Sequence, residues 1–450
     1  MAEEAATETE GRTEGGAAAL PEDVLFEIFS RVNTVSDLLR CALSCKPWRR
    51  LLTDRAFLRR LWPDQLGHGS HHRSRLLGFF FQQRRFVRRK KLMKARVKQH
   101  SSAFAPAFLP TPGSPLAGGC RDLAAFVADA DGTFNYAQPL ASRRGVVLVR
   151  LAPRDCFQRT ATAGGLLLGL CNPVTGERHV APPLETCACL GRHVNGYAIL
   201  TGDDDDTGGG VDHLPRRRPS SPAFTRLLLT GLHQDDRHIH LHSYSAATRC
   251  WAGPTACLHG DKFRMAGAAA AVVHRGAAHW LYFDARRPQD ERHDLYAPSA
   301  ELVGTGTAAR VSFTKLPVDA GWSPYLCVTG DGRLSIVGVR ATSVEVWTRQ
   351  DGDDADGDPA AWLWTRQAIR IPAAAQLVPE CPSLLQSIHW FHLDKGAMVA
   401  VYNGDGAFVV DIAREVVEKV VDCSLSLGYF SCVPYEMDLP ELFLLQLGGQ

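Results

Sequence analysis

The chain contains 450 residues, and 45% of them are hydrophobic, which is enough to bury a large core and predicts two or three domains. Its formal net charge of +2 at pH 7 indicates neither nucleic acid nor a membrane surface as the main partner. The 13 cysteines are scattered and odd in number, which is typical of a reducing compartment. We therefore expect a cytoplasmic or nuclear protein.

Residues 1–19 are acidic and rich in small residues, with few side chains that could be buried. They have neither the basic region nor the apolar region of a signal peptide, so a disordered tail is expected. No later apolar run reaches the length of a membrane span, and no membrane partner is expected.

Residues 20–62 have the pattern of short amphipathic helices. Pro21 and the acidic pair after it suit a first helical turn, and apolar residues follow at helical spacing: Val24, Leu25, Ile28, Phe29 and Val32. Ser36 is predicted to cap a second helix, and Pro47 to begin a third. Helices this short are marginal in isolation. Their apolar faces therefore either pack only on the downstream domain or are completed by a partner.

The same stretch runs from Leu20-Pro21 and two acidic residues to a Lys46-x-Trp48 motif, and in this order it resembles the F-box. The resemblance implies docking onto the Skp-family adaptor of a cullin–RING ubiquitin ligase. Carried onto this sequence, the adaptor contacts are expected at Leu20, Pro21, Leu25, Ile28, Leu38, Leu39, Leu43, Cys45, Trp48 and Leu51, with Phe29 and Val32 as second choices. The sequence departs from the family pattern at residues 32–35, where Leu-Pro is more frequent, and at Pro47.

Residues 63–115 are predicted to form a polar, basic connector. Their most basic part is the acid-free run at 84–98, which is a candidate for nuclear import through Arg88, Arg89, Lys90 and Lys91. The alternatives are a solvated linker and nucleic-acid binding. Phe86 is the only aromatic residue in this run, so base stacking has little support and nucleic acid is not an expected partner.

From residue 116 to 450 the pattern changes to short strands and tight turns. Runs rich in β-branched, Leu and aromatic residues occur at 145–151, 165–170, 195–201, 224–230, 238–244, 279–283, 325–329, 333–339, 343–348, 397–402 and 407–411. Turn sequences separate them, such as those at 172–177, 329–332 and 403–406. At ~40–50 residues per four-stranded blade, this region would form about six to eight blades of a β-propeller. The predicted fold class is α+β, a small three-helix module followed by a large all-β domain.

Three segments of the chain resemble plant F-box proteins that carry an F-box-associated β domain. Residues 164–183 contain an apolar strand, an Asn-Pro-x-Thr turn and a strand that ends in Pro-Pro, and 274–283 and 73–82 match other segments of these proteins. The resemblance implies a propeller-like domain that presents a face or loops to a target protein, and it says nothing of which target.

Other candidate features favour structural interpretations. The acidic, Gly-rich stretches at 202–222 and 350–360 are predicted to be loop insertions. His238, His240 and His242 would share one face of a strand, as either a metal platform or a polar outer face. The familiar nucleophile, zinc-protease and phosphate-loop motifs are absent, so no catalytic residue, metal or cofactor is assigned.

The function predicted from these features is the substrate-recognition subunit of an SCF-type (Skp–cullin–F-box) ubiquitin ligase. Its partners would be the Skp-family adaptor, the cullin and RING subunits reached through it, and an unknown target protein. Such a receptor is not an enzyme. The alternative is a nuclear scaffold or a β-propeller enzyme whose N-terminal helices only pack internally.

Overall fold

The structure is a computed structural model of the whole chain. It describes residues 20–32, 34–62, 75–83, 106–112, 114–116, 121–127, 133–134, 137–151, 166–184, 194–204, 224–232, 238–259, 263–265, 270–284, 295–302, 309–316, 322–340, 342–350, 364–372, 377, 389–394, 398–403, 406–422 and 429–447. The disordered tail predicted at 1–19 and the basic run at 84–98 lie outside these ranges.

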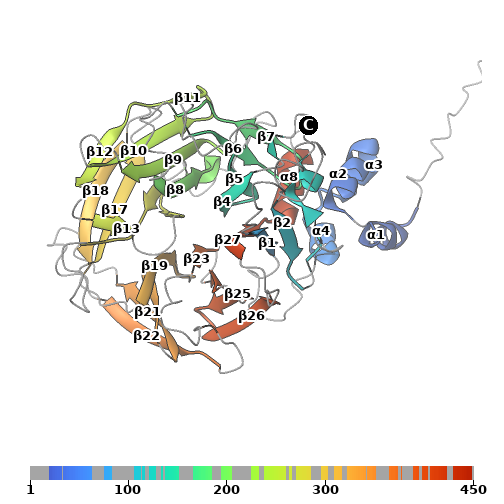
Figure 1. Cartoon of the computed structure of the whole chain (residues 1–450). Helices are drawn as coiled ribbons and strands as arrows, with labels where there is room; N and C mark the ends of the chain where they lie inside the picture. The colour runs from blue at the N-terminus through green and yellow to red at the C-terminus, as the bar shows by residue number, and fades with distance from the viewer. Residues whose placement is uncertain are drawn as a thin grey trace, which may run out of the picture.

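The described strands form six antiparallel sheets, arranged as blades around a central axis (Figure 1). The first blade contains β1 (Leu76–Gln83), β2 (Ala107–Pro110), β3 (Arg121–Asp122) and β27 (Tyr429–Glu436), and the short helix α6 (Leu123–Phe126) follows β3. The second contains β4 (Gln138–Arg143), β5 (Val146–Arg150), β6 (Leu168–Cys171) and β7 (Arg178–Val180). The third contains β8 (Val194–Leu200), β9 (Arg226–Leu232), β10 (His238–Ser245), β11 (Cys250–Trp251) and β12 (Thr255–His259).

The other three blades complete the ring. The fourth contains β13 (Phe263–Met265), β14 (Val272–His274), β15 (Ala277–His279), β16 (Tyr282–Asp284), β17 (Leu295–Leu302) and β18 (Ala309–Leu316). The fifth contains β19 (Trp322–Val328), β20 (Leu334–Val339), β21 (Ser343–Arg349) and β22 (Trp364–Arg370). The sixth contains β23 (His389–His392), β24 (Met398–Tyr402), β25 (Gly406–Asp411) and β26 (Val416–Asp422). The chain is thus a six-bladed β-propeller preceded by helices, as its strand and turn pattern predicted.

The first blade joins the two ends of the propeller sequence. Its strand order is β27-β1-β2-β3, and β27 pairs with β1 so that Val433 lies opposite Phe80. This pairing closes the ring and leaves no unpaired edge between the first strand and the last. Strands β1 and β2 fall within residues 63–115, so part of the predicted connector belongs to the first blade instead.

The N-terminal module contains four helices, one more than predicted: α1 (Glu22–Ser30), α2 (Val35–Ser44), α3 (Lys46–Leu51) and α4 (Arg55–Leu61). Thr34, not the predicted Ser36, caps α2, because its Oγ1 accepts a hydrogen bond of 3.1 Å from the Asp37 backbone N–H. Ser36 lies inside the helix and donates from Oγ to the Val174 carbonyl at 2.7 Å. That bond ties α2 to the second blade.

Helix α8 (Leu439–Leu447), which follows β27, packs between the N-terminal helices and the ring. Arg49 donates from Nε and Nη2 to the Leu447 carbonyl at 2.8 and 2.6 Å. The rings of Trp62 and Phe443 pack edge to face with centroids 5.3 Å apart. Buried residues of α1, α2 and α4 share one hydrophobic cluster with the first blade and α8. The helical module is therefore packed onto the propeller through a common core.

The histidine-rich strand β10 was considered either as a metal platform or as a strand with a polar outer face. His240 and His242 are both buried, on a strand that pairs with β9 and β12. A polar outer face is therefore wrong for these two side chains. Within the described ranges, no group of three or more His, Cys, Asp or Glu side chains is placed to hold a metal ion. No described helix is both long and apolar enough to cross a membrane.

Candidate functional site

The N-terminal module carries four of the six large hydrophobic side chains that are exposed among the described residues. Leu20, Val24, Ile28 and Leu43 retain 40%, 43%, 42% and 66% of their accessible surface. Among described residues, the only other large hydrophobic side chains this exposed are Val180 and Phe313, on separate blades. Exposed apolar side chains concentrated in one module are typical of an interaction site. These four residues are called the apolar face below.

Helical spacing explains how α1 serves two surfaces at once. Leu25 and Phe29 lie one turn apart and are buried in the shared core. Val24 and Ile28, each one position earlier, lie one turn apart on the outer side and remain exposed. A helix that is apolar on more than its inner side therefore keeps its fold and still presents a second apolar surface.

Helix α2 divides in the same way. Leu38 and Ala42 are buried, Leu39 is half-buried, and Leu43 near the end of the helix is the most exposed large hydrophobic residue described. Trp48 of α3 is half-buried and packs edge to face on Phe29, with ring centroids 5.4 Å apart. Trp48 therefore helps to hold α1 and α3 together.

The residues predicted to contact an adaptor thus fall into three groups. Leu20, Pro21, Ile28 and Leu43 are exposed, and Leu39, Cys45, Trp48 and Leu51 are half-buried. Leu25 and Leu38 are buried in the module's own core, so they support the surface from beneath and do not form it. The second choices are also interior, Phe29 fully and Val32 in part. Val24 was missing from the predicted set, although it belongs to the same apolar stripe of the sequence.

Charged side chains lie near the exposed apolar residues in the sequence of the helices. Arg60 of α4 lies 3.3 Å from Glu22 and 3.4 Å from Asp23, and Arg40 lies 2.7 Å from Asp37. Hydrogen bonds from Thr34 and Arg40 lower the pKa of Asp37 below its ordinary value. These pairs are exposed and add little to stability. A combination of exposed apolar and charged residues is usual at a protein–protein interface.

A cluster of charged side chains lies where the inner strands of several blades approach one another. Arg143 at the end of β4 contacts Asp204 at 2.5 Å and Asp394 at 3.4 Å, and Arg144 also pairs with Asp394. The backbone N–H of Asp394 donates to both carboxyl oxygens of Glu436, at 2.8 and 3.0 Å. The network joins β4, β27 and the segments after β8 and β23. Removing one partner of a buried ion pair of this kind is strongly destabilising, because it leaves the other charge buried and uncompensated.

Burial and neighbouring charges shift the pKa values in this network. Burial alone would raise the pKa of Asp394, but Arg143 and Arg144 hold it well below its ordinary value. Burial and the charge of Asp394 raise the pKa of Glu436 to about 8. The predicted loop insertion at 202–222 is wrong for its first residues. Gly202–Asp204 form the short 3₁₀ helix η5, and Asp204 is part of this network. Residues 205–222 of that range, like 351–360 of the other predicted insertion, lie outside the described residues.

In a comparison with protein-family models, the helical module matches one model. A family model described as F-box-like matches residues 17–63, the stretch that forms α1 to α4. No curated protein is significantly similar to the chain.

Several solved structures resemble the chain at low similarity. One is a nidogen/laminin complex, with 13% identity over 80% of this chain and 98% of that chain and a TM-score of 0.38. Another is a quinoprotein alcohol dehydrogenase-like protein from Bacteroides thetaiotaomicron, with 9% identity over 76% and 62% and a TM-score of 0.34. Identities and TM-scores this low do not allow a function to be assigned to this chain from those structures. The chain combines an N-terminal F-box-like domain with a six-bladed β-propeller.

Proposed function

We propose that this protein is the substrate-recognition subunit of an SCF-type ubiquitin ligase. The F-box-like domain would bind a Skp-family adaptor, and the propeller would bind the target protein. The observation that carries the proposal is the apolar face of Leu20, Val24, Ile28 and Leu43, which stays exposed on a module that an F-box-like family model matches. Cullin and RING subunits would be reached through the adaptor.

The packing of the helices bears on how such a receptor would work. A receptor of this kind needs no chemistry of its own, because it raises the effective concentration of target lysines near the ubiquitin thioester. That gain depends on geometry, and a module packed on the propeller through α8 presents its partner in a defined orientation. Internal packing alone would account for Leu25 and Phe29 but would leave Val24 and Ile28 without a role.

A binding measurement tests this proposal directly. The full chain is mixed with a purified Skp-family adaptor, and the affinity is measured by calorimetry, followed by co-purification with the cullin subunit. Saturable binding at micromolar or lower concentration is expected for a standard interface. Absence of measurable affinity for every Skp-family adaptor tested would refute the receptor function.

We propose that the protein acts in the cytoplasm, the nucleus or both, where such ligases could assemble.

A further inference from the structure

Helices α3 and α4 carry a concentration of positive charge. Residues 46–61 contain six basic residues and one acidic residue, although the formal net charge of all 450 residues is only +2. The acidic residue, Asp54, accepts a hydrogen bond from a backbone N–H of α4. Arg49 donates to the Leu447 carbonyl, and Arg60 lies 3.3 Å from Glu22. The other four basic residues are exposed, and no described residue forms an ion pair with them: Lys46, Arg50, Arg55 and Arg59.

The positions of these four basic residues oppose the stability of the two helices. Lys46 and Arg55 are the first residues of α3 and α4, where the backbone N–H groups already present partial positive charge. Arg50 follows Lys46 by four residues, and Arg59 follows Arg55 by four, so like charges repel along one side of each helix. Arrangements that oppose the local fold are expected where function requires them.

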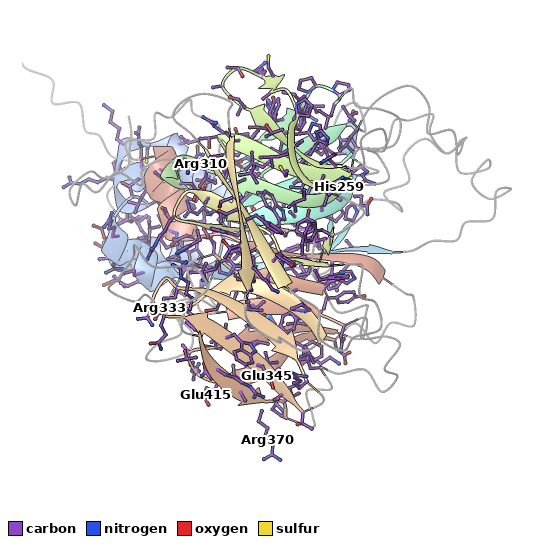
Figure 2. All side chains as sticks on the ribbon, turned by 90° about the vertical axis from the view of Figure 1, so that its left-hand side faces the viewer. His259, Arg310, Arg333, Glu345, Arg370 and Glu415 are labelled. Carbon is purple, nitrogen blue, oxygen red and sulfur yellow. The ribbon has the colours of Figure 1, made fainter. Side chains whose placement is uncertain are left out.

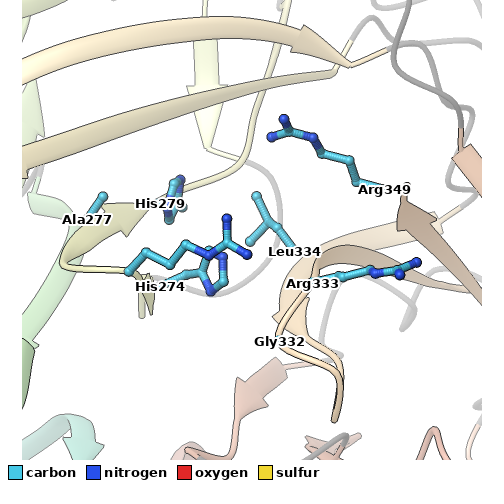
Figure 3. Close-up of a pocket in the computed structure, with 8 residues that line it drawn as sticks. His274, Ala277, His279, Gly332, Arg333, Leu334 and Arg349 are labelled. Atoms are coloured by element: carbon cyan, nitrogen blue, oxygen red, sulfur yellow. The ribbon is translucent and has the colours of Figure 1, made fainter. Parts of the chain in front are cut away.

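Two groups of basic side chains on the propeller differ from this one, because their members have partners. In the hollow between the fourth and fifth blades (Figure 3), Arg333 lies 3.1 Å from the Asp331 carboxylate, and the two other arginines that line the hollow also have interaction partners. On the fifth blade, Glu345 (labelled in Figure 2) pairs with Arg366 and lies 3.3 Å from Arg340. These groups need no further partner to balance their charge.

The four basic residues belong to elements that pack against those of the apolar face. Lys46 follows Leu43 by three residues, and α3 contacts α2. Arg60, near the end of α4, contacts both acidic residues at the start of α1. Figure 1 shows α1–α4 grouped at one edge of the ring. A partner that covers the apolar face would therefore enter the electrostatic field of α3 and α4, which sums over all four charges and does not require them to meet at one point.

We infer that these four basic residues bind an acidic surface of the adaptor and speed its association with the apolar face. The inference rests on the proposed function and adds the chemistry of the partner, which is an excess of Asp and Glu side chains on the surface that meets α3 and α4. Complementary charges raise the association rate constant, and this effect decreases as salt is added. A second copy of this chain would be a poorer occupant, because it would bring the same positive charges together.

Stopped-flow kinetics of the full chain with a purified Skp-family adaptor test the inference. One variant carries Lys46→Gln, Arg50→Gln, Arg55→Gln and Arg59→Gln, because glutamine forms helices about as well as these residues do. We expect its association rate constant at low salt to fall about tenfold or more, and its dissociation rate constant to change less than about threefold. Raising the salt from about 0.05 M to about 0.5 M should slow association of the wild type and leave the variant nearly unchanged.

A matched control variant removes the same number of charges from the blades. It carries Arg249→Gln, Arg310→Gln, Arg370→Gln and Arg414→Gln, all at exposed positions, and Figure 2 labels two of them, Arg310 and Arg370. The net charge changes equally in both variants, so only the place of the charge distinguishes them. Thermal unfolding gives a second measurement. Without like-charge repulsion, the α3–α4 variant should unfold at the same temperature as the wild type or at a higher one.

Several results would overturn the inference. Equal association rate constants in the wild type and the α3–α4 variant would do so, while measurable adaptor affinity would still support the proposed function. Equal slowing in the control variant would assign the effect to net charge alone. A lower unfolding temperature of the α3–α4 variant would assign the four basic residues to the fold. Absence of adaptor binding at every salt concentration would refute both the inference and the proposed function.

Discussion

Replacing Ile28 and Leu43 together by alanine should abolish most adaptor binding without unfolding the protein. Both side chains belong to the apolar face, and neither is part of the buried core that α1 and α2 share with the propeller. Substitutions at exposed positions usually change stability by no more than about 0.5 kcal/mol. Loss of binding in this variant would therefore report a lost contact.

The size of the effect follows from the surface that each side chain can still bury. Full burial of a Leu or Ile side chain contributes ~1.5–3 kcal/mol. Leu43 has 66% of its surface exposed and Ile28 has 42%, so the shares available to a partner are about 1–2 and 0.6–1.3 kcal/mol. Together they correspond to adaptor binding that is about 15- to 250-fold weaker.

The assay is calorimetry or surface-immobilised binding with a purified Skp-family adaptor, with circular dichroism to check the fold. Val180→Ala is the matched control, because Val180 is 46% exposed but lies on β7 of the second blade. Leu25→Ala gives a useful contrast. It leaves a cavity in the shared core and should lower the free energy of unfolding by ~2–5 kcal/mol. Wild-type affinity in the Ile28→Ala, Leu43→Ala variant would refute the reasoning.

Further predictions concern the charge network, the helix–propeller junction and localisation. Glu436 has a pKa raised from an ordinary value of 4.5 to about 8, so its contribution to stability is complete below pH 4.5 and is lost as pH rises through 8. Glu436→Gln should flatten the decline of the unfolding free energy between these pH values in urea titrations, and an unchanged slope would contradict the shift. Arg49→Ala removes both hydrogen bonds to the Leu447 carbonyl and should lower the free energy of unfolding by ~1–2 kcal/mol, measured by denaturant unfolding. Arg50→Ala is the control, because Arg50 is an exposed neighbour, and it should lower the free energy of unfolding much less. Alanine at each of residues 88–91 should shift a fluorescent fusion toward the cytoplasm, and an unchanged distribution would leave this run without an import role.

The sequence alone determined the local structure and the fold class. Apolar residues at helical spacing predicted α1 and α2, and short β-branched runs between turn sequences predicted a large all-β domain of propeller type. These features follow from side-chain periodicity and turn chemistry, which act over a few residues. The capping residue of α2 was misassigned because Thr34 and Ser36 are equally suitable in sequence, and only the backbone at Thr34 is extended.

Only the tertiary structure decided which apolar residues of the helices are exposed. Leu25 and Ile28 are equally apolar in sequence, but the packing of α1 into the shared core, where it contacts α4, buries Leu25 and leaves Ile28 exposed. The same holds for the ring closure by β27 and β1 and for the pairing of Asp204 with Arg143. Each joins segments far apart in the chain, and their proximity arises from the packing of the blades around one axis, which no local pattern encodes.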